Sequence, residues 1–368
     1  MTTRRGALFA PALFLSGCAT AQPIIPPAAP GPGLHARAAA KGLAFGVALT
    51  SEQLNEPDLV AAVRTECGGI VAEYEMKWAA VEPRRGERRF TGADRLAAFA
   101  RNNRIALRGH TLIWHESEPP WLGRLEARGL DAALVDHIGA VAARFRGRVG
   151  TWDVVNEAVR PEDGRLDWLR RTRPLEVMGP DYIARAFRAA READPAARLA
   201  YNDFGCEHAT TPSRRKRLGV LGLLRGLKAA GVPVQVLGVQ AHLAAHLPFE
   251  AEEWRDFLAD VAELGMTIEV TELDVNDARL PATEGVRDAA SAALVRRFLD
   301  ATLAEPAVKA VFCWGLSDRH SWIRQGRLAD HRRRDQAKPR PLPYDEAMRR
   351  KPMWDAIASA FDAAPPRS

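Results

Sequence analysis

Short apolar runs alternate with longer amphipathic stretches along the chain from Gly42 onwards. The short runs are nearly continuous in apolar residues, as expected of strands that are buried on both faces of a sheet. They are Leu43–Leu49, Gly69–Ala72, Ile105–Arg108, Thr151–Val155, Arg198–Asn202, Val236–Gln240, Thr267–Thr271 and Ala310–Trp314. Strands that alternate with helices predict a parallel sheet with right-handed crossover connections.

The stretches between these runs have helical spacing. Between residues 130 and 145, Leu134, Ile138, Val141 and Phe145 recur on one face of a helix. Residues 180–193, 213–230, 251–264 and 289–303 show the same spacing. Eight strand–helix units within about 320 residues predict one α/β catalytic domain, a closed (β/α)8 TIM barrel. The alternative, an open doubly wound sheet, usually carries a glycine-rich phosphate loop, which this sequence lacks.

The composition is that of a globular protein, with 47% hydrophobic and 27% charged residues. The net charge is +6, but basic residues are mixed with acidic ones throughout the chain. Nucleic-acid binding would require a basic stripe with interleaved aromatic residues, and the sequence has no such stripe. We therefore do not expect a nucleic-acid partner.

The first 18 residues have the pattern of an export signal. Arg4 and Arg5 precede an apolar run, residues 7–15, that is too short to span a bilayer as a mature helix. Leu15-Ser16-Gly17-Cys18 resembles a bacterial lipobox, in which the cysteine is lipidated. An ordinary signal peptide cleaved just after this point is the alternative, and the arginine pair leaves twin-arginine or general export open.

These features define the expected segments of the chain. Residues 1–18 are the signal peptide with its lipobox, and residues 19–41, rich in Pro and Ala, are a tether. Residues 42–363 form the catalytic domain, and residues 364–368 are a tail. We expect a periplasmic or outer-membrane-anchored lipoprotein, or otherwise a secreted protein. The lipid is the only membrane contact expected.

Three cysteines remain beyond Cys18. Cys67, Cys206 and Cys313 are an odd number, and their spacing is not that of a metal site. Each lies in or beside an apolar run, which predicts buried free thiols. One disulfide among them is the alternative in an oxidising compartment.

Two carboxylates follow predicted strands. Glu157 ends the fourth strand, in Trp152–Ala158, and Glu272 ends the seventh, in Thr271–Asp274. The carboxyl ends of barrel strands form the active face, so the two side chains should converge there. Glycoside hydrolysis uses such a pair, one protonated and one ionised. We expect the charge of Glu272 to raise the pKa of Glu157 by repulsion.

The other strand ends supply groups that suit a sugar. Sugars present hydroxyls around the ring edge, for Lys, His, Asn and Gln, and apolar C–H faces, for Trp. The candidates are Glu73, Lys77, His110, Trp114, Asn156, Gln240, His242, Trp314 and Trp322. His110 and His115 do not have the spacing of metal ligands, so we expect neither a metal nor a cofactor.

Five motifs occur in the order found in one family. They are Gly109–His115, Trp152–Ala158, Gln240–Leu243, Thr271–Asp274 and Trp314–Trp322. In these stretches the chain resembles glycoside hydrolase family 10 endo-1,4-β-xylanases. The resemblance implies a (β/α)8 barrel and a retaining double displacement on xylan or xylo-oligosaccharides. Separately, we expect the protein to be a monomer.

The resemblance assigns roles to individual residues. Glu157 is the acid/base and Glu272 the nucleophile. Asn156 holds the sugar 2-hydroxyl, His242 hydrogen-bonds the nucleophile, and Asp274 orients His242. The remaining candidates named above line the sugar subsites.

Two residues depart from the family pattern. Tyr74 stands where the family usually has Asn, and Phe204 stands where Tyr is common. These departures concern subsite affinity and leave the reaction class unchanged. The alternatives are a retaining β-glycanase on glucan or cellulose, and a noncatalytic glycan-binding barrel. Xylose lacks the exocyclic CH₂OH of glucose, and Trp322 is our candidate for a wall that excludes this group.

Overall fold

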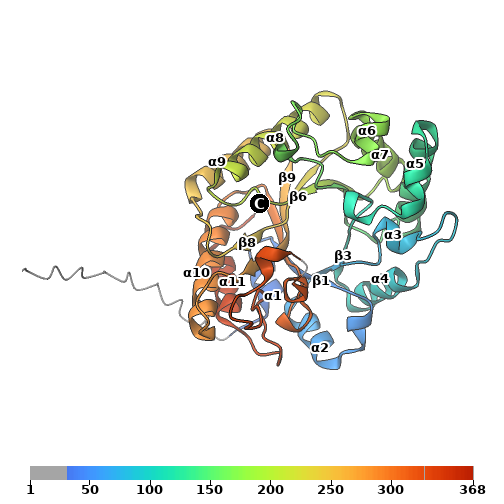
Figure 1. Ribbon diagram of the computed structural model, residues 1–368. Helices are drawn as coiled ribbons and strands as arrows, with labels where there is room; N and C mark the ends of the chain where they lie inside the picture. Colours follow the sequence, from blue (N-terminus) through green and yellow to red (C-terminus); the bar gives the residue numbers. More distant parts are fainter. Residues whose placement is uncertain (1–30, 327, 368) are drawn as a thin grey trace, which may run out of the picture.

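A computed structural model describes residues 31–326 and 328–367, and its centre is a closed ring of parallel strands (Figure 1). Each strand pairs in parallel with the next, and β10 pairs with both β9 and β1, which closes the ring. The ring consists of β1 (Ala44–Leu49), β2 (Gly69–Ala72), β3 (Ala106–Gly109), β5 (Thr151–Asn156), β6 (Arg198–Asp203), β7 (Val236–Val239), β9 (Thr267–Asn276) and β10 (Val308–Cys313). The predicted (β/α)8 barrel is confirmed, and each predicted strand corresponds to one of these eight.

Two short strands extend the ring at its carboxyl end. The strand β4 (Ile113–Trp114) pairs with β5 and places Trp114 opposite Asn156. The strand β8 (His242–Ala244) pairs with β9 and places His242 opposite Asp274. Neither strand was predicted, because two or three residues are too few to show a period of their own.

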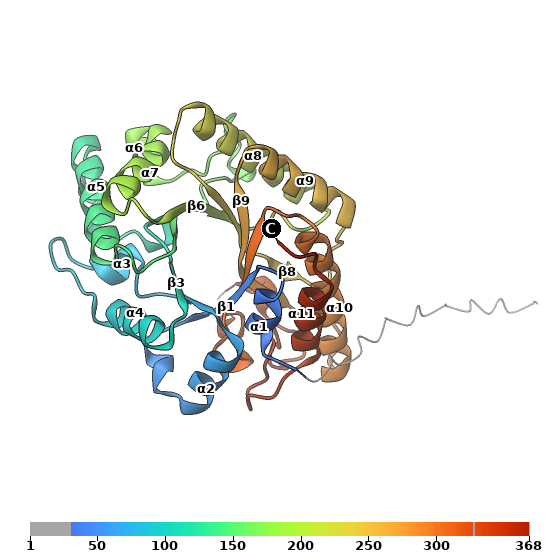
Figure 2. The ribbon, with the colours of Figure 1, turned by 180° about the vertical axis from the view of Figure 1, so that it is seen from behind.

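Helices surround the strand ring on all sides (Figures 1 and 2). They are α1 (Leu34–Ala39), α2 (Pro57–Glu66), α3 (Trp78–Val81), α4 (Thr91–Asn103), α5 (Ala127–Arg144), α6 (Arg173–Met178), α7 (Asp181–Ala193), α8 (Thr211–Ala229), α9 (Ala251–Glu263), α10 (Glu284–Leu303) and α11 (Pro352–Ala363). The five predicted helices correspond to α5, α7, α8, α9 and α10. The largest difference is at α10, which begins five residues before its predicted start.

The interior of the barrel contains a layer of charged side chains as well as apolar ones. Arg108 on β3 donates through Nε to Asp153 on β5 at 3.1 Å, and it also pairs with Glu269 on β9. Arg198 on β6 contacts Glu269 from the other side at 3.1 Å. Buried charges persist only when they are paired, and here one layer of pairs spans the barrel below the strand ends.

The N-terminal boundary differs from the expectation. The predicted tether, residues 19–41, overlaps α1, whose Leu34 and Ala38 are fully buried in the core. The fold therefore includes α1, which packs on β1 and α11. The predicted signal peptide and Cys18 lie outside the described residues. Within the described part, no helix has the length and apolar character needed to cross a membrane.

The three described cysteines are buried and unpaired. Cys67, Cys206 and Cys313 are all free thiols, as predicted. Burial raises the pKa of each thiol well above its usual range, which leaves all three in the unreactive protonated form.

The carboxylate of Glu66 fastens α1 to the barrel, and its removal should destabilise the protein. Glu66 is fully buried and accepts from the Leu34 amide at 2.8 Å, the Tyr344 hydroxyl at 2.6 Å and Arg350 at 2.6 Å. Removal of the carboxylate leaves these donors unsatisfied. We expect Glu66→Ala to lower the free energy of unfolding by about 3 kcal/mol in urea titrations.

The matched control is Glu87→Ala. Glu87 contacts Arg84 at 3.1 Å, but both side chains are more than half exposed. Its removal should change the free energy of unfolding by less than about 0.5 kcal/mol. Equal effects of the two substitutions would contradict the role assigned to Glu66.

Candidate active site

The two carboxylates lie together at the carboxyl ends of the strands. Glu157 directly follows β5, and Glu272 lies within β9. Both are buried, with exposed fractions of 8% and 4%. Glu157 has a positive φ of 60°, a strained conformation for a residue with a side chain. Strain of this kind at a buried polar residue is typical of a functional site.

Two amide side chains connect the carboxylates. Asn202 on β6 donates to Oε1 of Glu272 and to Oδ1 of Asn156, each at 2.8 Å. Asn156 in turn donates to Oε1 of Glu157 at 3.1 Å, and Gln240 donates to the same oxygen at 3.1 Å. The five side chains form one network across the barrel mouth, so the position of each carboxylate depends on that of the other.

The surroundings of Glu157 favour its protonated form. Burial raises the pKa of Glu157, and the charge of Asp203 raises it further, against the opposing effects of Trp114, Gln240 and Arg170. The direction agrees with the expectation, but the cause does not. We expected repulsion by Glu272, whereas burial and Asp203 are the main contributors.

Asp203 has close partners at both of its oxygens. Lys216 lies 2.7 Å from one of its oxygens, and the hydroxyl of Tyr201 donates to the other. Arg170 also lies beside Glu157, with Nη2 3.9 Å from Oε2. Arg170 also donates to the backbone carbonyl of Glu157 at 2.6 Å. Charged groups of both signs therefore flank the proton donor.

Glu272 is held in its ionised form. Burial alone would raise the pKa of Glu272, but the hydrogen bond from His242 and the nearby charge of His110 outweigh it, and the pKa is lowered. Nε2 of His242 lies 3.3 Å from Oε2 of Glu272, and Nδ1 lies 2.8 Å from Oδ1 of Asp274. The indole N–H of Trp322 donates to the second oxygen of Asp274 at 2.7 Å.

His242 carries the charge that balances these carboxylates. Burial opposes its protonation, but Asp274 and Glu272 outweigh burial, and the pKa of His242 lies well above its usual value. Two carboxylates and one imidazolium thus form a chain that ends at Trp322. The expected roles of His242 and Asp274 are consistent with this geometry.

An aromatic and cationic wall faces the carboxylates. The ammonium group of Lys77 lies 4.6 Å from the ring centroid of Trp114 and 5.7 Å from that of Trp314. His110 packs against Trp314 at 5.2 Å, and its Nδ1 lies 3.0 Å from Asp153 in the buried charged layer. The strand ends thus place cation, imidazole and indole groups together.

The two residues that depart from the family pattern border the mouth. The side chain of Tyr74 is 58% exposed and that of Phe204 is 39% exposed. Lys216 and Arg170 lie near the Phe204 ring, at 4.9 and 6.0 Å from its centroid. Neighbouring Glu73 is largely enclosed. Burial raises the pKa of Glu73 to about 7 against the opposing charge of Lys77.

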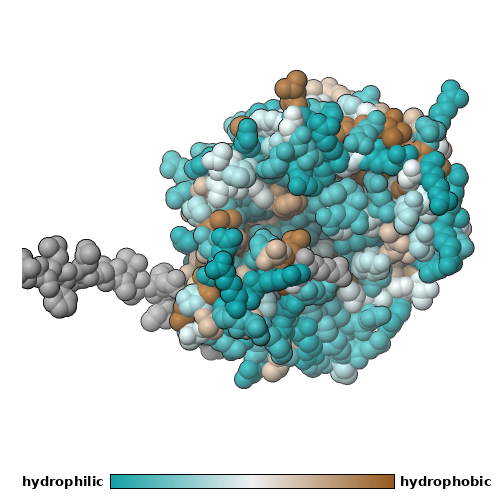
Figure 3. Space-filling view, viewed as in Figure 1, coloured by the Kyte–Doolittle hydropathy of each residue, from teal (hydrophilic) through white to brown (hydrophobic). Residues whose placement is uncertain are grey.

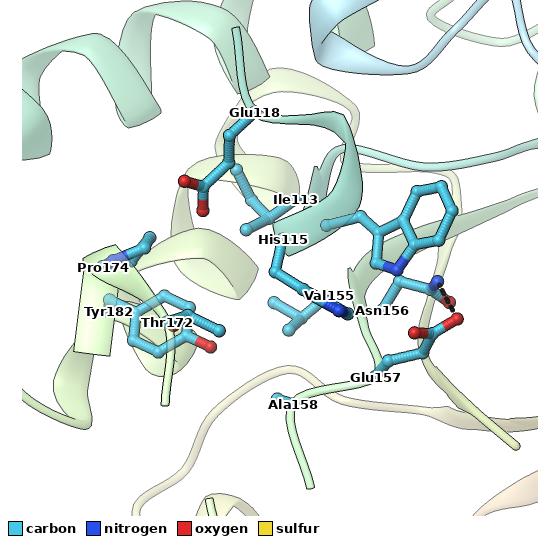
Figure 4. Close-up of a pocket in the computed structure, with 11 residues that line it drawn as sticks. Ile113, His115, Glu118, Val155, Asn156, Glu157, Ala158, Thr172, Pro174 and Tyr182 are labelled. Carbon is cyan, nitrogen blue, oxygen red and sulfur yellow. Dashed lines mark hydrogen bonds between the residues drawn. The ribbon is translucent and has the colours of Figure 1, made fainter. Parts of the chain in front are cut away.

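A narrow hollow opens behind Glu157 (Figure 4). Asn156 and Glu157 lie at one end of it, and Glu118 and Tyr182 lie at the other, with His115 between them. Burial, together with the charges of Arg170 and two other basic residues, lowers the pKa of His115 to about 3. His115 therefore remains neutral, and it adds no positive charge beside the proton donor.

Sequence reasoning assigned no role to several residues that act here. They are Asp153, Arg170, Asn202, Asp203 and Lys216. Asp153, Asn202 and Asp203 lie on predicted strands or at their ends, where a buried polar residue is itself a signal. Arg170 lies in the irregular segment between β5 and α6, where no periodicity marks it. Lys216 lies on an otherwise basic helix surface and is distinguished only by its burial.

Metal binding has no support in this part of the molecule. Among residues 31–326 and 328–367, no group of three or more His, Cys, Asp or Glu side chains could hold a metal ion. The arrangement instead suits acid/base and nucleophilic chemistry by two carboxyl groups in opposite protonation states.

Known proteins share this sequence and fold. Endo-1,4-beta-xylanase A of Fusarium oxysporum f. sp. lycopersici is 35% identical over 303 residues, which cover 79% of this chain and 89% of that protein. Endo-1,4-beta-xylanase B of Thermotoga neapolitana is 36% identical over 253 residues, covering 68% of this chain and 70% of that protein. Xylanase 10B of Thermotoga petrophila, solved with xylobiose, superposes with a TM-score of 0.81 at 32% identity and covers 90% of this chain and 98% of that one.

The family assignment agrees with these relatives. The profile of the family described as Glycosyl hydrolase family 10 matches residues 33–360. This range begins one residue before α1 and ends within α11, so it includes every strand of the barrel. The chain belongs to glycosyl hydrolase family 10.

Proposed function

We propose that this barrel is an endo-1,4-β-xylanase, which hydrolyses internal β-1,4-xylosidic bonds of xylan with retention of configuration. The observation that carries the proposal is a pair of buried carboxyl groups in one mouth whose surroundings shift their pKa values in opposite directions. The pKa of Glu157 is raised and that of Glu272 is lowered. The family membership and the xylanases among the relatives support the substrate.

The first half of the reaction breaks the glycosidic bond. Glu157 protonates the glycosidic oxygen while an oxygen of Glu272 attacks the anomeric carbon. The aglycone leaves with the proton of Glu157, and the xylosyl unit remains as an ester of Glu272. Protonation is available because Glu157 is buried, and attack is available because His242 hydrogen-bonds Glu272 in its ionised form.

The second half of the reaction releases the sugar. Glu157, now ionised, removes a proton from water as the water attacks the anomeric carbon. The ester bond breaks, and Glu272 leaves as a carboxylate. His242 and Asn202 both hydrogen-bond this carboxylate, so they stabilise the charge that returns to it.

The surrounding groups bind the sugar chain. The amide of Asn156 hydrogen-bonds Glu157 directly and is linked to Glu272 through Asn202, and it suits the 2-hydroxyl next to the bond that breaks. Lys77 and His110 suit the other hydroxyls, and Trp114 and Trp314 offer apolar ring faces. Trp322 lies with its ring centroid 5.0 Å from that of His242, beside the nucleophile. It forms the wall that fits xylose and excludes the CH₂OH of glucose.

The protein works as a monomer on its polymer substrate. The large exposed apolar side chains of the described residues are scattered: Tyr74, Leu166, Phe204, Leu218, Val286 and Leu328. The face shown in Figure 3 is mostly hydrophilic, with only small separate apolar patches. A stable dimer would be expected to use a larger continuous patch.

The carboxylates test the proposed reaction directly. The wild-type protein should release reducing ends from xylan and far fewer from carboxymethyl cellulose. Glu272→Ala should abolish hydrolysis of every substrate. Glu157→Ala should slow xylan hydrolysis by about 10²- to 10⁴-fold and spare the first step on an aryl xyloside whose leaving group needs no proton.

Azide distinguishes the retaining mechanism in the same variant. Added to Glu157→Ala with an activated aryl xyloside, azide should restore turnover and yield the β-xylosyl azide. The α-azide would contradict a nucleophilic Glu272.

The wild-type assay separates the alternative functions. Preference for carboxymethyl cellulose over xylan would identify a glucanase. Binding of xylan without release of reducing ends would identify a noncatalytic barrel.

The pH profile tests the source of the raised pKa of Glu157. Asp203 raises this pKa by its negative charge, so Asp203→Asn should lower it. Glu157 then loses its proton at lower pH, and the alkaline limb of kcat/KM on xylan should move to lower pH. Asp167→Asn, at a half-exposed carboxylate paired with Arg165, is the control and should leave the limb in place. An unmoved limb in Asp203→Asn would show that burial alone raises the pKa.

Export and lipidation form a separate part of the proposal. Arg4 and Arg5, the apolar run 7–15 and the lipobox ending at Cys18 support an exported protein that carries lipid on Cys18. Expressed in bacteria, the protein should incorporate labelled palmitate and sediment with membranes. Cys18→Ser should abolish the label and release or block processing of the protein. Wild-type protein found entirely in the soluble fraction would contradict lipidation.

A further inference from the structure

His331 packs against Trp322 from the loop that follows β10. It ends the short 3-10 helix Ala329–His331, and only 6% of its surface is exposed. The two rings meet edge to face, with centroids 4.6 Å apart and planes at 80°. Aromatic pairs prefer this geometry, so the contact restricts the orientation of the indole.

Trp322 has three further groups of contacts. Its N–H donates to Asp274 at 2.7 Å, its ring packs on the apolar cluster that contains Phe312 and Trp314, and its ring centroid lies 5.0 Å from that of His242. These contacts hold the indole from the barrel side. The contact with His331 adds the restraint from the loop after β10.

The backbone around His331 is held in place. The amide of Asn276, at the end of β9, donates to the carbonyl of Asp330 at 3.2 Å. Arg333 donates to the carbonyl of Leu280 at 2.9 Å. His331 thus stands on a segment anchored to the strand that carries the nucleophile.

His331 is also neutral at ordinary pH. Burial lowers its pKa, and the positive charge of His242 lowers it further, against the effects of Asp330 and Asp274. A neutral ring places no additional positive charge beside His242. The contact with Trp322 is therefore one of packing rather than of charge.

We propose that His331 is a positioning residue, which holds Trp322 as the wall of the sugar subsite and thereby sets the preference for pentosides over hexosides. This inference rests on the proposed function, in which Trp322 excludes the CH₂OH of glucose. Without His331 the indole loses its restraint from the loop after β10 and can shift away from the subsite. The space required by CH₂OH then becomes accessible, and contact with the xylose ring weakens.

The experiment compares two activated substrates. We measure kcat/KM of the wild type and of His331→Ala on an aryl β-xylobioside and an aryl β-cellobioside. An edge-to-face pair changes an equilibrium by about 2- to 12-fold. We expect the xylobioside-to-cellobioside ratio to fall within that range in His331→Ala, through a higher KM for the xylobioside and little change in its kcat. His331→Phe, which restores an aromatic edge, should return the ratio towards the wild-type value.

Controls separate positioning from a general structural role. Arg334→Ala, at an exposed residue of the same loop, should leave the ratio unchanged. Equal losses on both substrates in His331→Ala, an unchanged ratio, or a ratio that His331→Phe does not restore would each overturn the inference. Thermal unfolding shows whether His331→Ala is folded. If it is not, His331→Asn takes its place in the comparison with His331→Phe. A wild-type protein inactive on the xylobioside would instead contradict the proposed function.

Discussion

Two buried carboxyl groups in one barrel mouth must be kept in opposite protonation states, and most of the active-site structure serves this requirement. At the separation usual for retaining sites, about 5 Å, two carboxylates repel by about 3 kcal/mol at an effective dielectric constant of about 20. The two carboxyl groups have different surroundings, and this difference favours the proton on Glu157 rather than on Glu272. Glu272 receives hydrogen bonds from His242 and Asn202, whereas burial and the charge of Asp203 raise the pKa of Glu157.

The order of the strands in the barrel gives Glu157 and Glu272 these different surroundings. Glu157 lies between Asn156 and the Asp203–Lys216 pair, on the side of β5 and β6. Glu272 lies on β9, beside the strand β8 that carries His242. Because neighbouring strands are parallel and in register, each carboxylate has partners from the strand next to its own. The same register places His110 over the charged layer of Arg108 and Asp153, so the mouth is supported from below.

Much of this arrangement could be predicted from the sequence, and the limits have physical causes. The apolar pattern and the residue composition identify strands of four or more residues. Because Glu157 and Glu272 follow the predicted carboxyl ends of such strands, both can be assigned to the carboxyl-terminal face of the barrel. Periodicity does not identify Trp114 and His242 as strand residues, because β4 and β8 contain only two and three residues. It also does not reveal that α1 belongs to the fold, since the hydrogen bonds from Leu34, Tyr344 and Arg350 to Glu66 join distant parts of the chain.

The loop after β10 connects the proposed sugar subsite with the catalytic carboxylates. Trp322 touches His331 in the loop at one side and hydrogen-bonds Asp274 at the other. Asp274 in turn contacts His242, which hydrogen-bonds the nucleophile. Any movement of the indole therefore acts on the sugar wall and on the partner of His242 together. The loop is therefore constrained at Trp322. The ring that forms the proposed wall of the subsite also donates a hydrogen bond to Asp274, and Asp274 and His242 form the chain that lowers the pKa of Glu272.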